Sequence, residues 1–178
     1  MAENLWATET PEDARAYDAR KDSGRFRFSV AVKRAVLWRL IEPRLPSPDR
    51  ETPILDLGGG TGVWAIRLAE AGHRVTMLDI APGYLARARE KIAAAGLTDL
   101  IAVEQGDICD LSRYAADAYP VVLALATRCR TATTQRAPLA RFCASRGPAA
   151  FSSPTWRTDT RRCVTADAPN RGKMLARC

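Results

Sequence analysis

The sequence predicts an α/β fold: an incomplete, doubly wound parallel sheet of about four strands, with a helical cap before it and an irregular tail after it. Short apolar runs alternate with segments of helical periodicity between residues 53 and 125, and glycine or proline marks most of the turns. Helices of this length between strands imply parallel strands covered on both faces. The loss of aliphatic residues after Leu125 predicts that the sheet stops there.

Residues 1–52 are expected to form the helical cap and a linker. Apolar side chains recur at helical spacing between Phe26 and Ile41, which indicates an amphipathic helix that serves as a packing element. Three prolines between residues 43 and 48 end this helix and make the linker. The apolar positions of the helix are Val32, Val36, Leu37, Leu40 and Ile41.

Residues 53–125 are expected to form the sheet domain. Its four short apolar runs predict strands at 53–57, 74–80, 100–107 and 121–125. A helix is predicted from Val63 to Ala71, because Gly72 follows in the position of a C-cap glycine. A second helix is predicted to start at Pro82, since proline is favoured at the first helical position, and to end at Gly96.

The most informative motif is LDLGGGTG, from Leu55 to Gly62. Its glycines lie at a predicted strand-to-helix turn, where missing side chains let the backbone approach a ligand and adopt positive φ. The helix that follows offers free N–H groups and the positive end of its dipole. The spacing is G-x-G-x-G followed by Val63, whereas the dinucleotide fingerprint requires Gly or Ala at that position.

This motif resembles the first motif of the class I S-adenosylmethionine-dependent methyltransferases, which is an apolar strand, an acid, one residue and then G-x-G-x-G. The resemblance extends over about Trp6 to Leu125 and implies a Rossmann-like fold and methyl transfer from S-adenosyl-L-methionine. The residues that it assigns to cofactor binding are Asp56, Gly58, Gly59, Gly60, Gly62, Asp79, Ile80, Asp107 and Ile108.

The resemblance gives the three acids different parts of the cofactor. Asp56 would help to hold the cationic methionine end, whereas it would repel a pyrophosphate. Asp79, 17 residues after Gly62, would accept both ribose hydroxyls, since a carboxylate has two acceptor oxygens. Asp107 would face the adenine amino group, and Ile108 would pack on the ring.

Each acid, taken singly, could instead cap a helix or a turn. Three acids at three successive strand ends share one edge of a parallel sheet, however, and ligands of open α/β sheets bind at that edge. Tyr17 and Arg25 are weaker candidates for contacts to the cofactor or the substrate, because in the family this segment often lids the cofactor. No catalytic residue is assigned, and the only histidine, His73, is expected at the opposite edge.

The net charge of +7 belongs entirely to residues 126–178. Residues 1–125 contain 16 Lys and Arg against 18 Asp and Glu, a net of −2, whereas the tail contains 11 against 2, a net of +9. A non-catalytic nucleic-acid-binding protein with a basic arm is therefore one alternative. The aromatic residues of the arm are scattered rather than interleaved for base stacking, so we expect a small-molecule acceptor instead of nucleic acid. A nicotinamide-dependent dehydrogenase is a second alternative, which Val63 and Asp56 disfavour.

The remaining composition predicts no metal site and no membrane segment. The five cysteines show no C-x-x-C pair or other metal-ligand spacing, and no secretory signal precedes them. No apolar run reaches the length of a membrane-spanning helix. We therefore expect a cytoplasmic protein whose oligomeric state the sequence does not specify.

The tail of 53 residues contains no Ile, no Glu, one Val and two Leu, which cannot build a sheet core. A change of reading frame near Leu125, either a real frameshift or a sequencing error, would account for this composition. If one base is restored ahead of codon 126, the reading frame moves by one base. The first two bases of each codon in the present frame then become the last two bases of a codon in the restored frame. Ser145 to Pro154 then encode a Pro-Gly-Gly turn followed by an apolar run, for permitted wobble bases. The family has this turn, and then a fifth strand, at the corresponding place.

Overall fold

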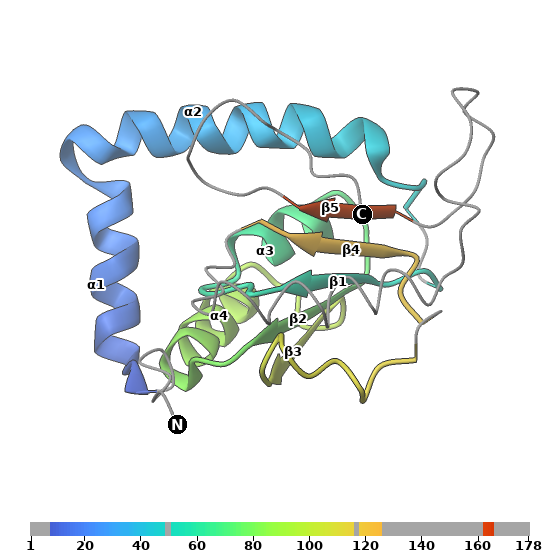
Figure 1. Cartoon of the computed structure of the whole chain (residues 1–178). Helices are drawn as coiled ribbons and strands as arrows, with labels where there is room; N and C mark the ends of the chain where they lie inside the picture. Colours follow the sequence, from blue (N-terminus) through green and yellow to red (C-terminus); the bar gives the residue numbers. More distant parts are fainter. Residues whose placement is uncertain (1–7, 49–50, 116–117, 126–161, 166–178) are drawn as a thin grey trace.

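The computed structural model describes residues 8–48, 51–115, 118–125 and 162–165, and for Arg25 and the last four residues it describes the backbone alone. The N-terminal part consists of α1 (Pro11–Asp22), α2 (Gly24–Ile41) and the 3-10 turn η2 (Glu42–Arg44) (Figure 1). The sheet domain consists of β1 (Ile54–Leu57), α3 (Val63–Glu70), β2 (Val75–Asp79), α4 (Pro82–Ala94), β3 (Ile101–Gln105), β4 (Val121–Ala124) and β5 (Arg162–Thr165).

The strands are all parallel and lie in the order β3-β2-β1-β4-β5. The chain adds β2 and then β3 on one side of β1, and it then returns to place β4 on the other side. Such a reversal defines a doubly wound sheet, in which ligands bind at the carboxyl ends of the strands beside the switch point. The predicted fold class is confirmed, and each of the four predicted strands is present within a few residues of its expected bounds.

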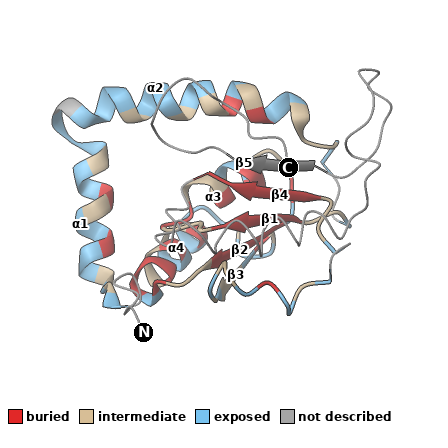
Figure 2. Cartoon of the chain, viewed as in Figure 1, coloured by how far each residue is buried: buried red, intermediate tan, exposed pale blue. Residues whose placement is uncertain are grey.

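The two faces of the sheet are covered by different parts of the chain. Helices α2, α3 and α4 pack on one face and share a continuous apolar core with the strands. The connection from β3 to β4 lies on the other face, where it contributes Ile108, Leu111, Tyr114 and Tyr119 to a second core. Figure 2 shows that the central strands β1, β2 and β4 are buried.

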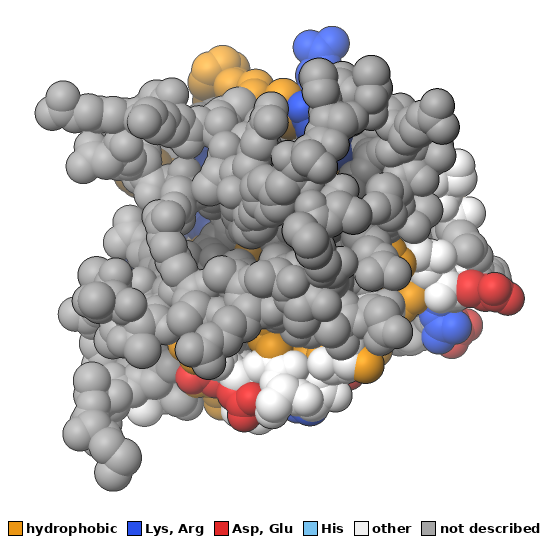
Figure 3. All heavy atoms as spheres, turned by 45° about the vertical axis from the view of Figure 1, so that its right-hand side comes forward, with side chains coloured by type: hydrophobic (Ala, Val, Ile, Leu, Met, Phe, Trp, Pro, Cys, Tyr) orange, Lys and Arg blue, Asp and Glu red, His pale blue; other side chains and the backbone are white. Residues whose placement is uncertain are grey.

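Helix α2 is the predicted amphipathic helix, but only its C-terminal end packs as expected. Trp38 and Ile41 lie in the core and are 8% and 1% exposed, whereas Val32 and Val36 are 45% and 48% exposed. The reason is that the first half of α2 extends away from α3 toward α1 (Figure 1). Hydrophobic side chains are accordingly exposed at the top of the molecule, where α2 lies (Figure 3).

Helix α1 packs against α4, and two features of the sequence fix the place where the first turns of these helices meet. A capping box begins the helix, because the Thr10 hydroxyl accepts from the Asp13 N–H and the Asp13 carboxylate accepts from the Thr10 N–H. At the start of α4, a Cβ on Gly83 would come within 2.3 Å of the Thr10 carbonyl carbon. Glycine at this position therefore lets the chain before α1 approach α4 closely.

The tail differs in part from the irregular structure expected for it. Residues Arg162–Thr165 form β5, which pairs with the whole of β4 from Val121 to Ala124. An edge strand needs only backbone N–H and C=O groups on one side, so four residues suffice without an aliphatic composition. The edge of β4 is therefore covered rather than bare. The other predictions for the tail fall outside the described residues.

Candidate functional site

The glycine-rich loop after β1 has the backbone geometry that requires glycine. Gly58, Gly60 and Gly62 have φ of 68°, 58° and 78°, in the left-handed region that other residues rarely adopt. Gly59 is required for space, because a Cβ there would lie 2.5 Å from Met77 Cγ. The Gly58 N–H donates to the Leu78 carbonyl at 2.8 Å, which fixes the loop against the end of β2.

Asp79, at the end of β2, organises the loop directly. Its Oδ2 accepts from the Gly60 N–H at 2.8 Å, and its Oδ1 accepts from the Ala81 N–H at 2.9 Å. A carboxylate has about four lone-pair positions, so each oxygen keeps capacity for one further donor. The side chain is half-buried and belongs to the carboxyl edge of the sheet. It therefore combines a structural role with two acceptor positions that a vicinal diol could use.

Asp56 is buried in β1 directly below the loop. It is 2% exposed, its Oδ2 has no hydrogen-bond partner among the residues that the structure describes, and a Cβ on Gly59 would lie 3.1 Å from that oxygen. Burial raises the pKa of the Asp56 carboxyl to about 7, the charge of Asp79 adds to the rise, and a backbone hydrogen bond with Ala65 opposes it. An acceptor that is buried and unpartnered among the described residues, under a loop made mostly of glycine, fits a ligand that carries positive charge.

The residues after β3 lie at the same edge of the sheet, and their geometry is less specific for a ligand. The Gly106 N–H donates to the Asp79 carbonyl at 2.9 Å, which joins the ends of β3 and β2. Asp107 is exposed, and its Oδ1 accepts from the Cys109 N–H at 2.8 Å, as in a turn cap. Ile108 is half-buried against the second core, and Ile80 is half-buried after Asp79. The adenine assignments of Asp107 and Ile108 stay predictions.

Tyr17 reaches the loop through a second tyrosine. Its ring lies 5.3 Å from that of Tyr84, and Tyr84 Cδ2 would lie 3.9 Å from a Cβ on Gly60. The Tyr17 hydroxyl accepts a hydrogen bond from Lys21, whose Nζ lies 3.9 Å from the ring centroid. The cap helix α1 thus approaches the loop by way of α4. The side chain of Arg25 lies outside the described residues.

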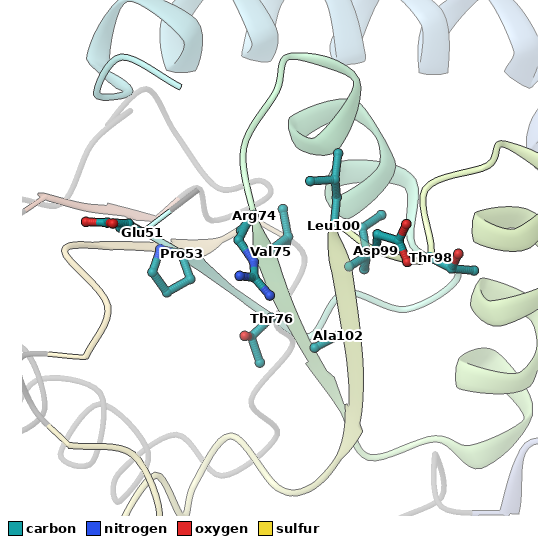
Figure 4. A pocket seen from close by; sticks show the side chains of 10 residues that line it. Glu51, Pro53, Arg74, Val75, Thr76, Thr98, Asp99, Leu100 and Ala102 are labelled. Atoms are coloured by element: carbon teal, nitrogen blue, oxygen red, sulfur yellow. The ribbon is translucent and has the colours of Figure 1, made fainter. Parts of the chain in front are cut away.

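A cavity of about 460 Å³ lies at the opposite edge of the sheet, at the amino ends of the strands. Figure 4 shows the side chains that line it, among them Glu51, Arg74, Thr76 and Asp99. None of the residues assigned to the cofactor lines this cavity.

In the part of the chain that the structure describes, no three His, Cys, Asp or Glu side chains are grouped as a metal ion would require. Within the same ranges, no helix is long and apolar enough to cross a membrane.

Known proteins resemble the chain over the segment that carries this geometry. The methyltransferase domain family matches residues 54–145, about half of the 178 residues. The tRNA 5-carboxymethoxyuridine methyltransferase of Escherichia coli K12 is 33% identical over 69 residues, which are 38% of this chain and 26% of that protein. The ubiquinone/menaquinone biosynthesis C-methyltransferase of Zymomonas mobilis is 32% identical over 90 residues, 50% of this chain and 37% of that protein. The matched segments thus span well under half of these curated relatives.

A solved structure from Methanococcus maripaludis, described as a candidate S-adenosyl-L-methionine-dependent methyltransferase, has the same fold. It aligns with a TM-score of 0.60 at 20% identity and covers 80% of this chain and 62% of that one. No comparison supports the alternative of a non-catalytic nucleic-acid-binding protein. The sheet order, the glycine-rich loop and the domain match agree, and the chain belongs to the class I S-adenosylmethionine-dependent methyltransferases.

Proposed function

We propose that the carboxyl edge of β1, β2 and β3 binds S-adenosyl-L-methionine for transfer of its methyl group to a small-molecule acceptor. The observation that carries this proposal is the buried, unpartnered Oδ2 of Asp56 under the glycine-rich loop. A cationic group at this place would compensate a carboxylate that is costly to bury alone. A pyrophosphate would meet two acids instead, Asp56 and Asp79.

The residues of this chain would hold the cofactor at three places. Asp56 would face the methionine end, the free acceptor positions of Asp79 would take the ribose hydroxyls, and Ile80 and Ile108 would border the adenine. The cofactor's sulfonium supplies an activated methyl group when it is bound. The task left to the protein is to orient the acceptor in line with that methyl and to exclude water. No general base among the described residues is assigned to this task.

The acceptor is proposed from charge rather than from similarity. One of the two curated relatives is named for a tRNA 5-carboxymethoxyuridine and the other for ubiquinone and menaquinone biosynthesis, so similarity does not indicate one class of acceptor. The cap and the sheet domain together, residues 1–125, carry a net charge of −2, so this part of the chain has no excess of cations for a nucleic-acid backbone. A small molecule is therefore the acceptor class that we propose.

The affinity for S-adenosylmethionine is expected to rise with pH between about 5.5 and 7. Asp56 has a pKa of about 7 and is therefore mostly protonated at the lower pH. A cation beside it favours the charged form, so binding must remove the proton, and affinity should rise by up to about tenfold per pH unit until Asp56 is ionised without ligand. Calorimetric titration in buffers of different ionisation enthalpy should show net proton release. An Asp56→Asn variant should show neither effect, while Asp107→Asn should keep both.

A parent protein whose affinity is constant over this range, with no proton released, would contradict the assignment of Asp56. The same titrations test the proposed function as a whole. S-adenosylhomocysteine should compete with S-adenosylmethionine, and NAD should not. Competition by NAD alone would instead favour the dehydrogenase alternative.

We also propose that residues 1–52 are the cap and linker, that residues 53–125 are the cofactor-binding domain, and that residues 126–178 are out of frame. The support is the composition of the tail and the turn and apolar run that one restored base recovers. In this proposal the cofactor half of the enzyme is intact, and the half that would bind the acceptor is lost.

A further inference from the structure

A buried carboxylate on the cap helix meets the glycine-rich loop. Asp18, on α1, is 8% exposed, and its Oδ1 accepts a hydrogen bond of 2.7 Å from the hydroxyl of Thr61, which is 2% exposed. Thr61 lies between Gly60 and Gly62, inside the loop proposed to hold the cofactor. Asp18 lies outside the motif that identifies the family, Thr61 occupies a position between two of its glycines, and 43 positions separate the two residues in the chain.

Two basic side chains of α4 complete this group. Arg87 Nε and Lys91 Nζ each lie 3.3 Å from Asp18 Oδ2. Lys91 Nζ also donates to Thr61 Oγ1 at 3.3 Å, so Thr61 accepts from the lysine and donates to the aspartate. Burial lowers the pKa of Lys91, and the charge of Asp18 opposes that shift. The four side chains therefore connect α1, the loop and α4 through charges that are buried at Asp18 and partly buried at Arg87 and Lys91.

The connection is sensitive to the position of the loop. A buried carboxylate that loses one of its donors is left with a desolvated acceptor, and this is more costly than the loss of an exposed hydrogen bond. If the loop moves away from α1, the Asp18–Thr61 bond breaks and that cost must be met. Beside this bond, the Tyr17 ring of α1 packs on Tyr84 of α4 at a centroid distance of 5.3 Å, and Tyr84 lies next to Gly60 of the loop.

We propose that Asp18 is a positioning residue that couples the placement of the cap helix α1 to the conformation of the cofactor loop, with Thr61 as its contact in the loop. This inference rests on the proposed function, because the coupling matters only if the loop binds the cofactor. When α1 is seated, the loop is held in one shape, and a ligand that needs this shape binds without the cost of ordering it. Asp18 acts through Thr61 and is not itself assigned a contact with the cofactor.

The test compares variants of this pair with a variant of another ion pair between the same helices. Thr61→Val removes the hydroxyl at nearly constant volume, Thr61→Ser keeps it, and Asp18→Asn removes the charge. The control is Arg15→Ala, because Arg15 joins α1 to Glu90 of α4 at 2.8 Å through exposed side chains. Two quantities are measured for each: the Kd for S-adenosylhomocysteine, and the hydrogen exchange of the α1 amides with and without this ligand.

Thr61→Val removes one hydrogen bond to a charged group, and Asp18→Asn removes the charge that this bond and the two basic side chains share. Each should weaken binding about tenfold, and the double variant should be little worse than either. Both should speed exchange in α1, and the added ligand should no longer protect this helix. Thr61→Ser and Arg15→Ala should bind and exchange like the parent. A thermal unfolding curve for each variant identifies any that fail to fold. If Asp18→Asn fails to fold, the comparison of Thr61→Val with Thr61→Ser decides the question.

Equal binding by the parent and by Thr61→Val would overturn the coupling, and so would additive effects in the double variant. A parent that binds no S-adenosylhomocysteine would overturn the proposed function and the coupling with it. In that case exchange in α1 without ligand would still report whether Asp18 and Thr61 hold the helix. Unchanged exchange in both variants would then show that they do not.

Discussion

Methyl transfer is expected to be absent from this chain and to appear when one base is inserted ahead of the codon for Ala126. The loops proposed to hold the cofactor follow the first three strands, which all precede the break. The acceptor pocket would follow the fourth strand, where the composition changes. Positioning of the acceptor against the methyl group contributes on the order of 7–11 kcal/mol to such a reaction, and a chain without the acceptor wall forfeits most of it.

The measurement compares the two forms in a screen of acceptors with labelled S-adenosylmethionine. The restored form should continue past residue 178, unfold more cooperatively and label an acceptor. Its new apolar run is expected to take the place beside β4 that Arg162–Thr165 occupy here. An inserted base placed 30 codons earlier serves as the control, because it should destroy the domain. The family match runs to residue 145, 20 residues past the proposed break, so the nucleotide sequence itself should be determined first.

A stop codon soon after the insertion would contradict the frame proposal. Methyl transfer by the unaltered chain at the rate of a complete enzyme would contradict it as well. In either case the basic tail would belong to the native protein, and β5 would be its own contribution to the sheet.

Replacement of Asp79 by Ala is expected to abolish measurable binding of S-adenosylhomocysteine. The variant loses two charge-assisted hydrogen bonds to the ribose, on the order of 1.5–3 kcal/mol each if both are well formed. It also loses the acceptor for the Gly60 N–H, which holds the loop in place without any ligand. Both losses act in the same direction, so the combined effect should exceed that of any other single substitution at the site.

Asp99→Ala is the matched control, because Asp99 lines the cavity at the opposite edge of the sheet. It should bind S-adenosylhomocysteine like the parent. The thermal unfolding of ligand-free Asp79→Ala separates the two contributions, since the loss of the Gly60 and Ala81 contacts lowers its midpoint and the loss of the ribose contacts does not. An Asp79→Ala protein that binds as tightly as the parent would remove Asp79 from the site.

The sheet could be predicted from sequence because its signals are local. The residues of β1, β2 and β4 form apolar runs that are buried on both faces, and glycine or proline lies next to each helix of the sheet domain. The prediction for α2 was only partly right for a tertiary reason. Its periodicity indicates a helix, and Val32 and Val36 were therefore expected to pack in the core. No local signal in the sequence shows that the first half of α2 extends away from α3, where these two side chains are exposed.

The site could be predicted only as far as its motif reaches. Asp56, Asp79 and the glycines could be placed because each lies in, or directly after, a strand that the sequence itself predicts. Asp18 and Thr61 meet because α1 folds back onto α4, and a polar helix of this kind carries no pattern that names its partner. The strand β5 was not predicted either, since an edge strand can form from backbone hydrogen bonds alone.

The most direct measurement of the central claim is a hydrogen-exchange footprint of S-adenosylhomocysteine on the whole chain. The ligand should protect backbone amides of the loop at residues 58–62 and of the end of β2 at residues 79–81. The cavity at the other edge, at residues 74–76 and 98–102, should exchange at the same rate with and without it. Protection of the cavity in place of the loop, or of neither, would contradict a cofactor site at the carboxyl edge of the sheet.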